Sequence, residues 1–258
     1  LGSLLKPLLR FLSHFNSHLL HGNFNAPVED DLESGITVLY AGYGSGRWCL
    51  EMAADFPNSN FIDVNISGVF PTIDIPHNLA FVKANTLTGL PFDDCTFDYA
   101  FQRFVGYSFS PSDWEVSVKE LARVTKPGGW VELFELISKL NRPPPDHDIL
   151  SNVVKEMLLA RGVDMGVKCD LPKLLTAQGF EDISSDFVSA PINWNGQVGV
   201  FMKNNLMNFW EACRPVVMSK LGLDEEGCTD LYIRTIQQMA KAKTYIDIPY
   251  VYGRKPFV

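Results

Sequence analysis

Three glycines at alternate positions, Gly42, Gly44 and Gly46, follow a short apolar run and precede a helical segment. A glycine lacks a Cβ, so the backbone can turn sharply there and approach a bound ligand closely. In doubly wound α/β folds, this turn after the first strand holds nucleotide-like ligands. The spacing G-x-G-x-G differs from the dinucleotide pattern G-x-G-x-x-G and favours an adenosyl ligand without a pyrophosphate. The alternative is a glycine turn that serves the backbone only.

Two carboxamides follow the next two expected strands. Asn65 occupies the place where such folds set a polar side chain on the ribose hydroxyls, usually a carboxylate that accepts both protons. Asp63 lies two residues earlier on the same strand face, either as a second partner or as a solvated residue. Asn85 can donate and accept, which suits the edge of an adenine ring. Its alternative role is to cap a turn.

The elements that must position these residues are short apolar runs alternating with helical segments, which is typical of βαβ units and a mostly parallel sheet. The fold class is therefore α/β and Rossmann-like. Strands are expected at residues 37–41, 60–64, 79–82, 97–101 and 130–134, with helices at 47–54 and 114–124. Residues 110–113 should cap the second helix, and residues 126–129 should form a turn. Later helices are expected at 149–160, 171–177, 198–220 and 225–243, and closing strands at 183–188 and 246–251.

Composition and charge exclude several functions for this chain. The formal net charge of −8 over 258 residues disfavours nucleic-acid binding, which needs clustered Lys and Arg. The five cysteines form no C-x-x-C pair, so neither a metal site nor a disulfide framework is expected. That cysteine usage favours an intracellular location, cytoplasmic or nuclear.

The chain length suggests one elaborated domain, divided into three parts. Residues 1–33 should form an N-terminal helical cap, in which residues 4–20 have the pattern of an amphipathic helix rather than of a membrane span. Residues 34–141 should form the cofactor-binding α/β core. Residues 142–258 should add a helical insertion and closing strands to the same domain.

Three further residues are candidates for general base by location alone: His21, Tyr107 and His147. For each of them, a packing or solvated role is the simpler interpretation.

Three motifs in order resemble class I S-adenosylmethionine-dependent methyltransferases: VLYAGYGSG at residues 38–46, GLPFDDCTFDY at 89–99 and LARVTKPGGWVE at 121–132. Three others resemble the fungal branch of that family, which includes regulators of secondary metabolism: LHGNFNAP at 20–27, WNGQVG at 194–199 and YGRKP at 252–256. The resemblance implies a seven-stranded sheet whose last strand is antiparallel. It also implies that the N-terminal helix and the later helices cover the substrate.

The same resemblance implies roles for individual residues. The turn would hold the methionine part of S-adenosylmethionine, Asn65 the ribose, and Asn85 with Thr86 the adenine. Gln102 and Arg103 would lie near the transferable methyl group. The turn residues concerned are Gly42, Tyr43, Gly44 and Gly46.

The sequence departs from the family at Tyr40 and Asn65, where acidic residues are usual, and at Tyr43, where a small residue or Cys is usual. Each lost charge-assisted hydrogen bond costs roughly 1.5–3 kcal/mol, so two losses weaken cofactor binding by about two to four orders of magnitude. Two functions therefore remain. One is methyl transfer to a small-molecule or protein acceptor. The other is an inactive pseudo-methyltransferase acting as a binding or regulatory subunit, with a protein partner or as a homodimer.

Overall fold

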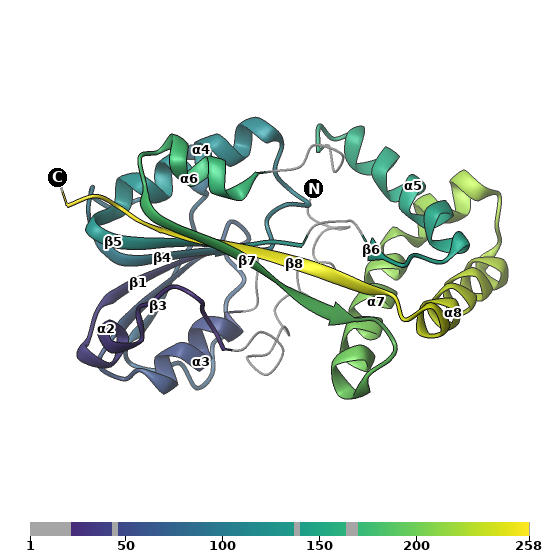
Figure 1. Cartoon of the computed structure of the whole chain (residues 1–258), viewed down its shortest axis with the longest axis horizontal. Coiled ribbons are helices and arrows are strands. Elements are labelled where there is room, and N and C mark those ends of the chain that lie inside the picture. The colour runs from purple at the N-terminus through teal and green to yellow at the C-terminus, as the bar shows by residue number, and fades with distance from the viewer. Residues whose placement is uncertain (1–21, 43–45, 137–139, 164–169, 258) are drawn as a thin grey trace.

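The computed structural model describes residues 22–42, 46–136, 140–163 and 170–257. Its centre is an eight-stranded sheet in the order β3-β2-β1-β4-β5-β8-β6, with β7 paired to β8 (Figure 1). Pairing is parallel from β3 to β5 and antiparallel at β8. The strands are β1 Thr37–Gly42, β2 Asn60–Val64, β3 Leu79–Val82, β4 Phe97–Arg103, β5 Thr125–Phe134, β6 Leu140–Asn141, β7 Glu181–Pro191 and β8 Tyr245–Arg254.

Helices cover both faces of the parallel strands, which explains why β1 and β4 are almost wholly buried. In Figure 1, α2 and α3 lie on one side of the strands, and α4 and α6 lie on the other. The remaining long helices, α5, α7 and α8, form a separate group at the far end of β7 and β8 (Figure 1). The helices are α2 Glu29–Ser34, α3 Arg47–Asp55, α4 Pro111–Val124, α5 Pro145–Leu159, α6 Leu171–Ala177, α7 Gly196–Leu221 and α8 Glu225–Ala242, besides the short 3-10 helix Thr86–Thr88.

Both ends of α4 are fixed by hydrogen bonds. At its start, the Ser110 hydroxyl accepts from the backbone N–H of Asp113, and the Asp113 carboxylate accepts from that of Ser110 at 2.8 Å. At its end, the Lys255 Nζ donates to the carbonyls of Ala122 and Thr125, both at 2.7 Å. The expected N-cap at residues 110–113 is confirmed, and the C-terminal stretch YGRKP gains a structural role.

Two expectations about the sheet need correction. Residues 126–129 do not form a separate turn, because β5 already begins at Thr125 and includes both glycines. The pairing of β5 with β4 shifts in register at this point, between Phe97 and Tyr99. Gly128 adopts a φ of +78°, which a glycine accepts without strain. The sheet also has eight described strands instead of seven, because the two-residue strand β6 adds itself to β8.

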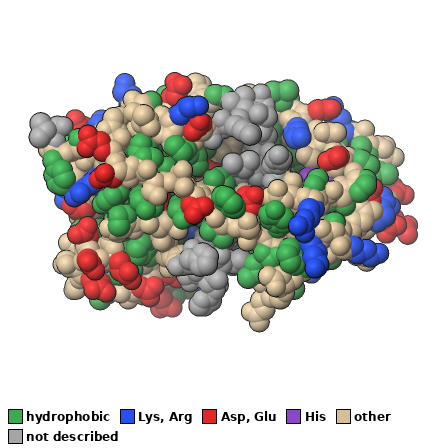
Figure 2. Space-filling model, in the orientation of Figure 1, with side chains coloured by type: hydrophobic (Ala, Val, Ile, Leu, Met, Phe, Trp, Pro, Cys, Tyr) green, Lys and Arg blue, Asp and Glu red, His purple; other side chains and the backbone are tan. Residues whose placement is uncertain are grey.

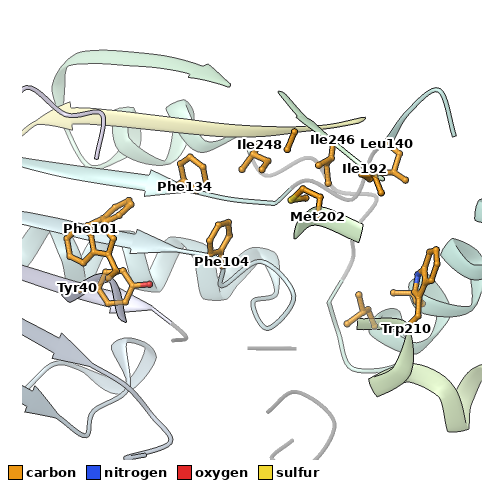
Figure 3. Packing of buried hydrophobic residues seen from close by; sticks show 14 of the residues in the cluster. Tyr40, Phe101, Phe104, Phe134, Leu140, Ile192, Met202, Trp210, Ile246 and Ile248 are labelled. Atoms are coloured by element: carbon orange, nitrogen blue, oxygen red, sulfur yellow. The ribbon is translucent and has the colours of Figure 1, made fainter. Parts of the chain in front are cut away.

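One apolar cluster runs from the sheet into the group of later helices. Figure 3 shows Tyr40 and Phe101 in the sheet, Met202 further along, and Trp210 in α7 at the far end of the same cluster. Strands β7 and β8 also join the sheet (Figure 1). These contacts agree with a single domain, although the three-part division stays a prediction, and residues 1–21 of the N-terminal cap lie outside the described residues.

Surface charge, helix hydropathy and the placement of possible metal ligands indicate what the described part of the chain could bind. Figure 2 shows acidic side chains gathered at the lower left, over α2, whose first turn carries Glu29, Asp30 and Asp31. Negative charge there suits the positive end of the helix dipole. Within the described ranges, no helix is both long and apolar enough to cross a bilayer, and no cluster of His, Cys, Asp and Glu could hold a metal ion.

Candidate cofactor site at the carboxyl edge of the sheet

The carboxyl ends of β1, β2 and β4 meet at one edge of the sheet. In the parallel register, Gly42 lies opposite Arg103, and Tyr40 lies opposite Asp63. This edge opens toward the later helices (Figure 1). Ligands of open α/β sheets bind at such an edge. Tyr43 and Gly44 of the glycine turn lie outside the described residues.

At Gly42, the space that a side chain would fill belongs to Tyr40. A Cβ built on Gly42 would lie 2.7 Å from the Tyr40 hydroxyl and ring, so any larger residue would displace the phenol. The sequence suggested that this missing side chain leaves room for a ligand. In the structure the Tyr40 side chain fills that space instead, and the contact of Gly42 with a cofactor stays a prediction.

Gly46 closes the turn and begins α3. Its φ of +80° is left-handed, and a Cβ there would lie 2.7 Å from the Phe81 ring. Both observations require glycine for the backbone itself. The requirement for glycine at this position is therefore explained, while a direct approach to ligand stays a prediction.

The two carboxamides lie where the sequence places them, at the ends of β2 and β3, and both make local turns. The Asn65 Oδ1 accepts from the Ser67 backbone N–H at 2.8 Å, and Asn65 is buried. The Asn85 Oδ1 accepts from the Leu87 N–H at 3.0 Å and caps the short 3-10 helix that Thr86 begins. Turn capping by Asn85 is thus observed, and its binding of adenine stays a prediction.

Gln102 and Arg103 point to opposite faces of the sheet. The Gln102 Oε1 accepts from the Ser117 hydroxyl of α4 at 2.5 Å, and its Nε2 is buried without a hydrogen-bond partner among the described residues. The Arg103 Nε donates to the Tyr40 hydroxyl at 2.9 Å on the side of α3. The two neighbours, which the sequence predicted to line one pocket, therefore point into different layers of the domain, and their contact with a cofactor stays a prediction.

The backbone after β4 is strained. Phe104 is almost fully buried and has a φ of +58°, a left-handed conformation that costs a bulky residue free energy. The strain is held in place because the Phe104 N–H donates to the Phe134 carbonyl at 3.0 Å and its ring packs against Phe134. Such outliers cluster at functional sites, which supports a site at this strand end.

A buried carboxyl lies beneath the turn. Asp63 is 2% exposed, and burial raises its pKa to about 7, although a hydrogen bond from Cys49 and the charge of Arg103 act in the opposite direction. Burial also raises the pKa of the Tyr40 hydroxyl to about 12. Tyr40 is therefore neutral at physiological pH, and Asp63 is not a solvated edge residue.

The candidate bases lie in different places. Tyr107 follows β4, its ring packs against Phe209 of α7 with centroids 5.5 Å apart, and burial raises its pKa well above the ordinary value. His147 lies in the first turn of α5, where burial lowers its pKa and its Nδ1 has no hydrogen-bond partner in the part of the chain that the structure describes. His21 lies outside the described residues. Of the two described candidates, Tyr107 is the one next to the sheet edge.

Two glutamates of β5 and its end were missed by the sequence reasoning. Glu135 accepts from the N–H groups of Val105 at 2.8 Å and Gly106 at 3.1 Å, which fixes the loop that carries Tyr107, and burial raises its pKa to about 8. The Glu132 carboxylate accepts from the backbone N–H of Asn25. A signal in the sequence could have indicated both residues, because two acidic residues occur in and directly after an otherwise apolar strand. A carboxyl group buried there needs hydrogen-bond donors from other segments.

Residues 38–129 match the model of a family described as a methyltransferase domain. Over this range the chain is similar to that family. The matched range runs from β1 into β5 and includes every described residue of the sheet edge named for cofactor binding. The fold is that of class I S-adenosylmethionine-dependent methyltransferases.

Three fungal proteins are similar to this chain in sequence. The methyltransferase str3 of Strobilurus tenacellus is 28% identical over 51% of this chain and 48% of its own length. The N-methyltransferase sirN of Leptosphaeria maculans is 24% identical over 90% of this chain and 84% of its own length. The secondary metabolism regulator laeA of Coprinopsis cinerea is 34% identical, but over only 36% of this chain and 23% of its own. The chain thus spans about half the length of the first of these relatives.

A solved structure supports the same fold. Phosphoethanolamine N-methyltransferase 2 of Haemonchus contortus, in complex with S-adenosyl-L-methionine, superposes with a TM-score of 0.54 at 17% identity, over 87% of this chain and 49% of that one. At this identity the likeness establishes the fold alone.

The described residues fit S-adenosylmethionine in donors but not in charge. Hydrogen-bond donors at the strand ends come from the carboxamides of Asn65 and Asn85, the guanidinium of Arg103 and the Nε2 of Gln102, which has no hydrogen-bond partner among the described residues. Tyr40 and Asn65 stand where the resemblance led us to expect carboxylates, and neither side chain carries a negative charge. The set can hold an adenosyl amino acid, with weaker compensation for its positive charges.

Proposed function

We propose that this chain transfers a methyl group from S-adenosylmethionine to a small-molecule acceptor. The observation that carries the proposal is the convergence of Gly42, Asn65 and Arg103 at the carboxyl ends of neighbouring parallel strands within the matched domain. S-adenosylmethionine supplies a methyl group already activated on a positively charged sulfur. The protein's task is then alignment of the acceptor and exclusion of water.

Each site residue has a part in this proposal. Asn65 binds the ribose hydroxyls, and Asn85 with Thr86 binds the adenine edge. Gln102 and Arg103, which point into the two layers of the domain, lie near the transferable methyl group. The glycine turn, with Gly42, Tyr43, Gly44 and Gly46, receives the methionine part through its backbone.

The acceptor lies between the sheet edge and the later helices in this proposal. Tyr107 and Phe209 join the loop after β4 to α7 there, and Glu135 fixes the loop through two backbone N–H groups. The name of sirN as an N-methyltransferase supports a nitrogen nucleophile on the acceptor. A place in the fungal branch of regulators rests on the stretches WNGQVG and YGRKP and on the short match to laeA.

The binding step is tested by calorimetry of the purified chain with S-adenosylhomocysteine and S-adenosylmethionine. Asn65→Asp should tighten both ligands by about 10-fold, because a carboxylate forms charge-assisted bonds with the ribose. Asn60→Asp is the matched control, since Asn60 is exposed at the opposite end of the same strand. An absence of heat with both ligands would overturn the proposal and favour the non-catalytic binding subunit.

The transfer step is tested with S-adenosylmethionine labelled in its methyl group. The protein is incubated with a low-molecular-mass extract of fungal metabolites and, separately, with the protein fraction of the same extract. Label should enter the small-molecule fraction and increase with Asn65→Asp. Label confined to the protein fraction would overturn the small-molecule acceptor.

A further inference from the structure

Strand β7 forms an open edge of the sheet. It runs beside β8 (Figure 1), and in the part of the chain that the structure describes no other strand pairs with it. From Ser184 to Phe187, the side chains on both faces of β7 are exposed. An unpaired edge presents a row of backbone N–H and C=O groups, to which another extended chain can hydrogen-bond.

The register with β8 shows which residues of β7 direct their backbone groups toward the open edge. In antiparallel strands, the N–H and C=O of one residue point to the same side, and successive residues alternate. The Pro249 carbonyl accepts from the Glu135 N–H, so Pro249 faces β5 and not β7. Phe187 lies opposite Pro249, and its backbone groups therefore point away from β8. Ser185 and Ser189, two positions before and after Phe187, share this orientation.

A carboxylate lies on this open edge. The Asp186 Oδ1 accepts from the outward N–H of Phe187 at 2.8 Å, which places a negative charge beside the backbone groups that a further strand would bind. The other charged residues of β7 are Glu181 and Asp182, and the strand contains no Lys or Arg. Many natural edge strands are protected by Lys, whereas the charges on this one are all acidic.

The acidic charge decides which kind of strand can pair with β7. A second copy of this chain, paired through the same edge, would bring acidic residues close to acidic residues, which destabilises a pair of strands. The formal charge of −8 on each copy adds repulsion. A strand that carries Lys or Arg instead attracts the Asp186 carboxylate. It thereby frees the Phe187 N–H for the backbone of that strand.

Phe187 offers an apolar contact on the other face of the strand. Its side chain is 56% exposed, and consecutive residues of a strand point to opposite faces, so Phe187 and Asp186 lie on different faces. Aromatic and aliphatic side chains that lie opposite each other on neighbouring strands stabilise a sheet. The strand that fits β7 therefore alternates apolar residues on the face of Phe187 with basic residues on the face of Asp186.

We propose that β7 binds an extended segment of a partner protein, with alternating apolar and basic residues, as an additional antiparallel strand. The backbone groups of Ser185, Phe187 and Ser189 form the hydrogen bonds, and the Asp186 carboxylate selects positive charge. This inference does not depend on the proposed function, because it uses no residue of the cofactor site.

The test measures binding of synthetic peptides to the whole chain by fluorescence anisotropy. The probe is a labelled peptide of alternating Val and Lys, about eight residues long, which is within the usual length of a strand. A matched peptide has Glu in place of Lys and should bind at least about 10-fold more weakly, because its charge repels that of β7.

Two N-methylated forms of the Val and Lys peptide test the pairing itself. In the proposed antiparallel register, each Val lies on the face of Phe187 and directs its N–H toward β7, whereas each Lys directs its N–H away. Methyl groups on the Val nitrogens should therefore weaken binding by about 10-fold or more. Methyl groups on the Lys nitrogens should change it little, although charge and composition are the same.

Three variants of the chain test the residues of β7. Ser185→Pro removes an outward N–H without removing a bond to β8, and should weaken the Val and Lys peptide by about 10-fold. Ser185→Ala keeps that N–H and is the matched control. Asp186→Asn keeps an oxygen for the Phe187 N–H but removes the charge, and should weaken binding by about 2- to 5-fold.

The outcomes distinguish strand addition from other ways of binding. Equal affinity of the two N-methylated peptides would overturn strand addition, and equal affinity of the Lys and Glu peptides would overturn the selection of charge. Self-association of the chain in ultracentrifugation, lost in Ser185→Pro, would make a second copy the occupant and overturn the partner protein. An absence of binding by every peptide would overturn the inference as a whole. If circular dichroism shows that Ser185→Pro is unfolded, the comparison of N-methylated peptides decides.

Discussion

Asn25 and Glu132 are 107 positions apart in sequence and joined by three hydrogen bonds. The Asn25 backbone N–H reaches both carboxylate oxygens, at 3.1 and 3.0 Å, and its Nδ2 donates to Oε1 at 2.8 Å. The same carboxylate accepts from the Ala26 N–H at 2.9 Å and from the Tyr99 hydroxyl at 2.8 Å. Glu132 is fully buried, so it ties the N-terminal stretch to the centre of the sheet.

Replacement of Glu132 by Gln should destabilise the fold by about 2–3 kcal/mol, because one amide oxygen cannot serve all these donors and its NH2 group faces them. Urea denaturation measures the change in free energy of unfolding. The matched control is Glu181→Gln, an exposed position on β7, which should change stability by less than about 0.5 kcal/mol. Equal effects at the two positions would show that the buried network contributes little.

The stretch WNGQVG requires glycine at position 199 because the backbone packs closely there. A Cβ on Gly199 would lie 1.7 Å from the Trp194 carbonyl oxygen, and the Asn193 N–H donates to the Gly199 carbonyl at 2.8 Å. Gly199→Ala should cost about 3 kcal/mol or more, because the helix start must move. Gly227→Ala in the first turn of α8 is the control, since its Cβ would meet only side-chain atoms at 3.1 Å or beyond. A thermal melt in which both variants unfold at the same temperature would contradict the packing argument.

Lys255 should stabilise the end of α4. Its Nζ donates to two terminal carbonyls, where positive charge also suits the helix dipole. Lys255→Met should cost about 1–2 kcal/mol in chemical denaturation. Lys241→Met, in the last turn of α8 and exposed, should stay within about 0.5 kcal/mol of the unchanged protein. The prediction is wrong if the two substitutions are equally mild.

Asp63 should make stability fall as pH rises. Burial raises its folded-state pKa to about 7, above the ordinary value of 3.8, so the unfolded chain loses this proton at lower pH than the folded one. The stability that Asp63 contributes is complete below about pH 4 and is lost progressively as pH rises to about 7. Asp63→Asn should flatten this fall in denaturation midpoints measured between those values. A slope unchanged by the substitution would place its cause elsewhere.

Much of the architecture could be predicted from the sequence because it depends on local pattern. The five parallel strands follow from apolar runs, and α4 follows from the capping residues Ser110 and Asp113. Helix α6 was predicted with its observed limits, Leu171–Ala177. The short strand β6 could not be predicted, since two residues have no periodicity and their pairing depends on β8.

The sequence by itself determined the order of strands and helices, the motifs similar to a methyltransferase domain, and the presence of Tyr40 and Asn65 at the ends of the first two strands. Tertiary structure alone decided what these and other buried polar residues contact. The phenol of Tyr40 fills the space beside Gly42, Arg103 reaches it from a neighbouring strand, and Glu132 captures Asn25. The physical reason is that burial and hydrogen bonding depend on contacts between residues far apart in the chain, which no local pattern records.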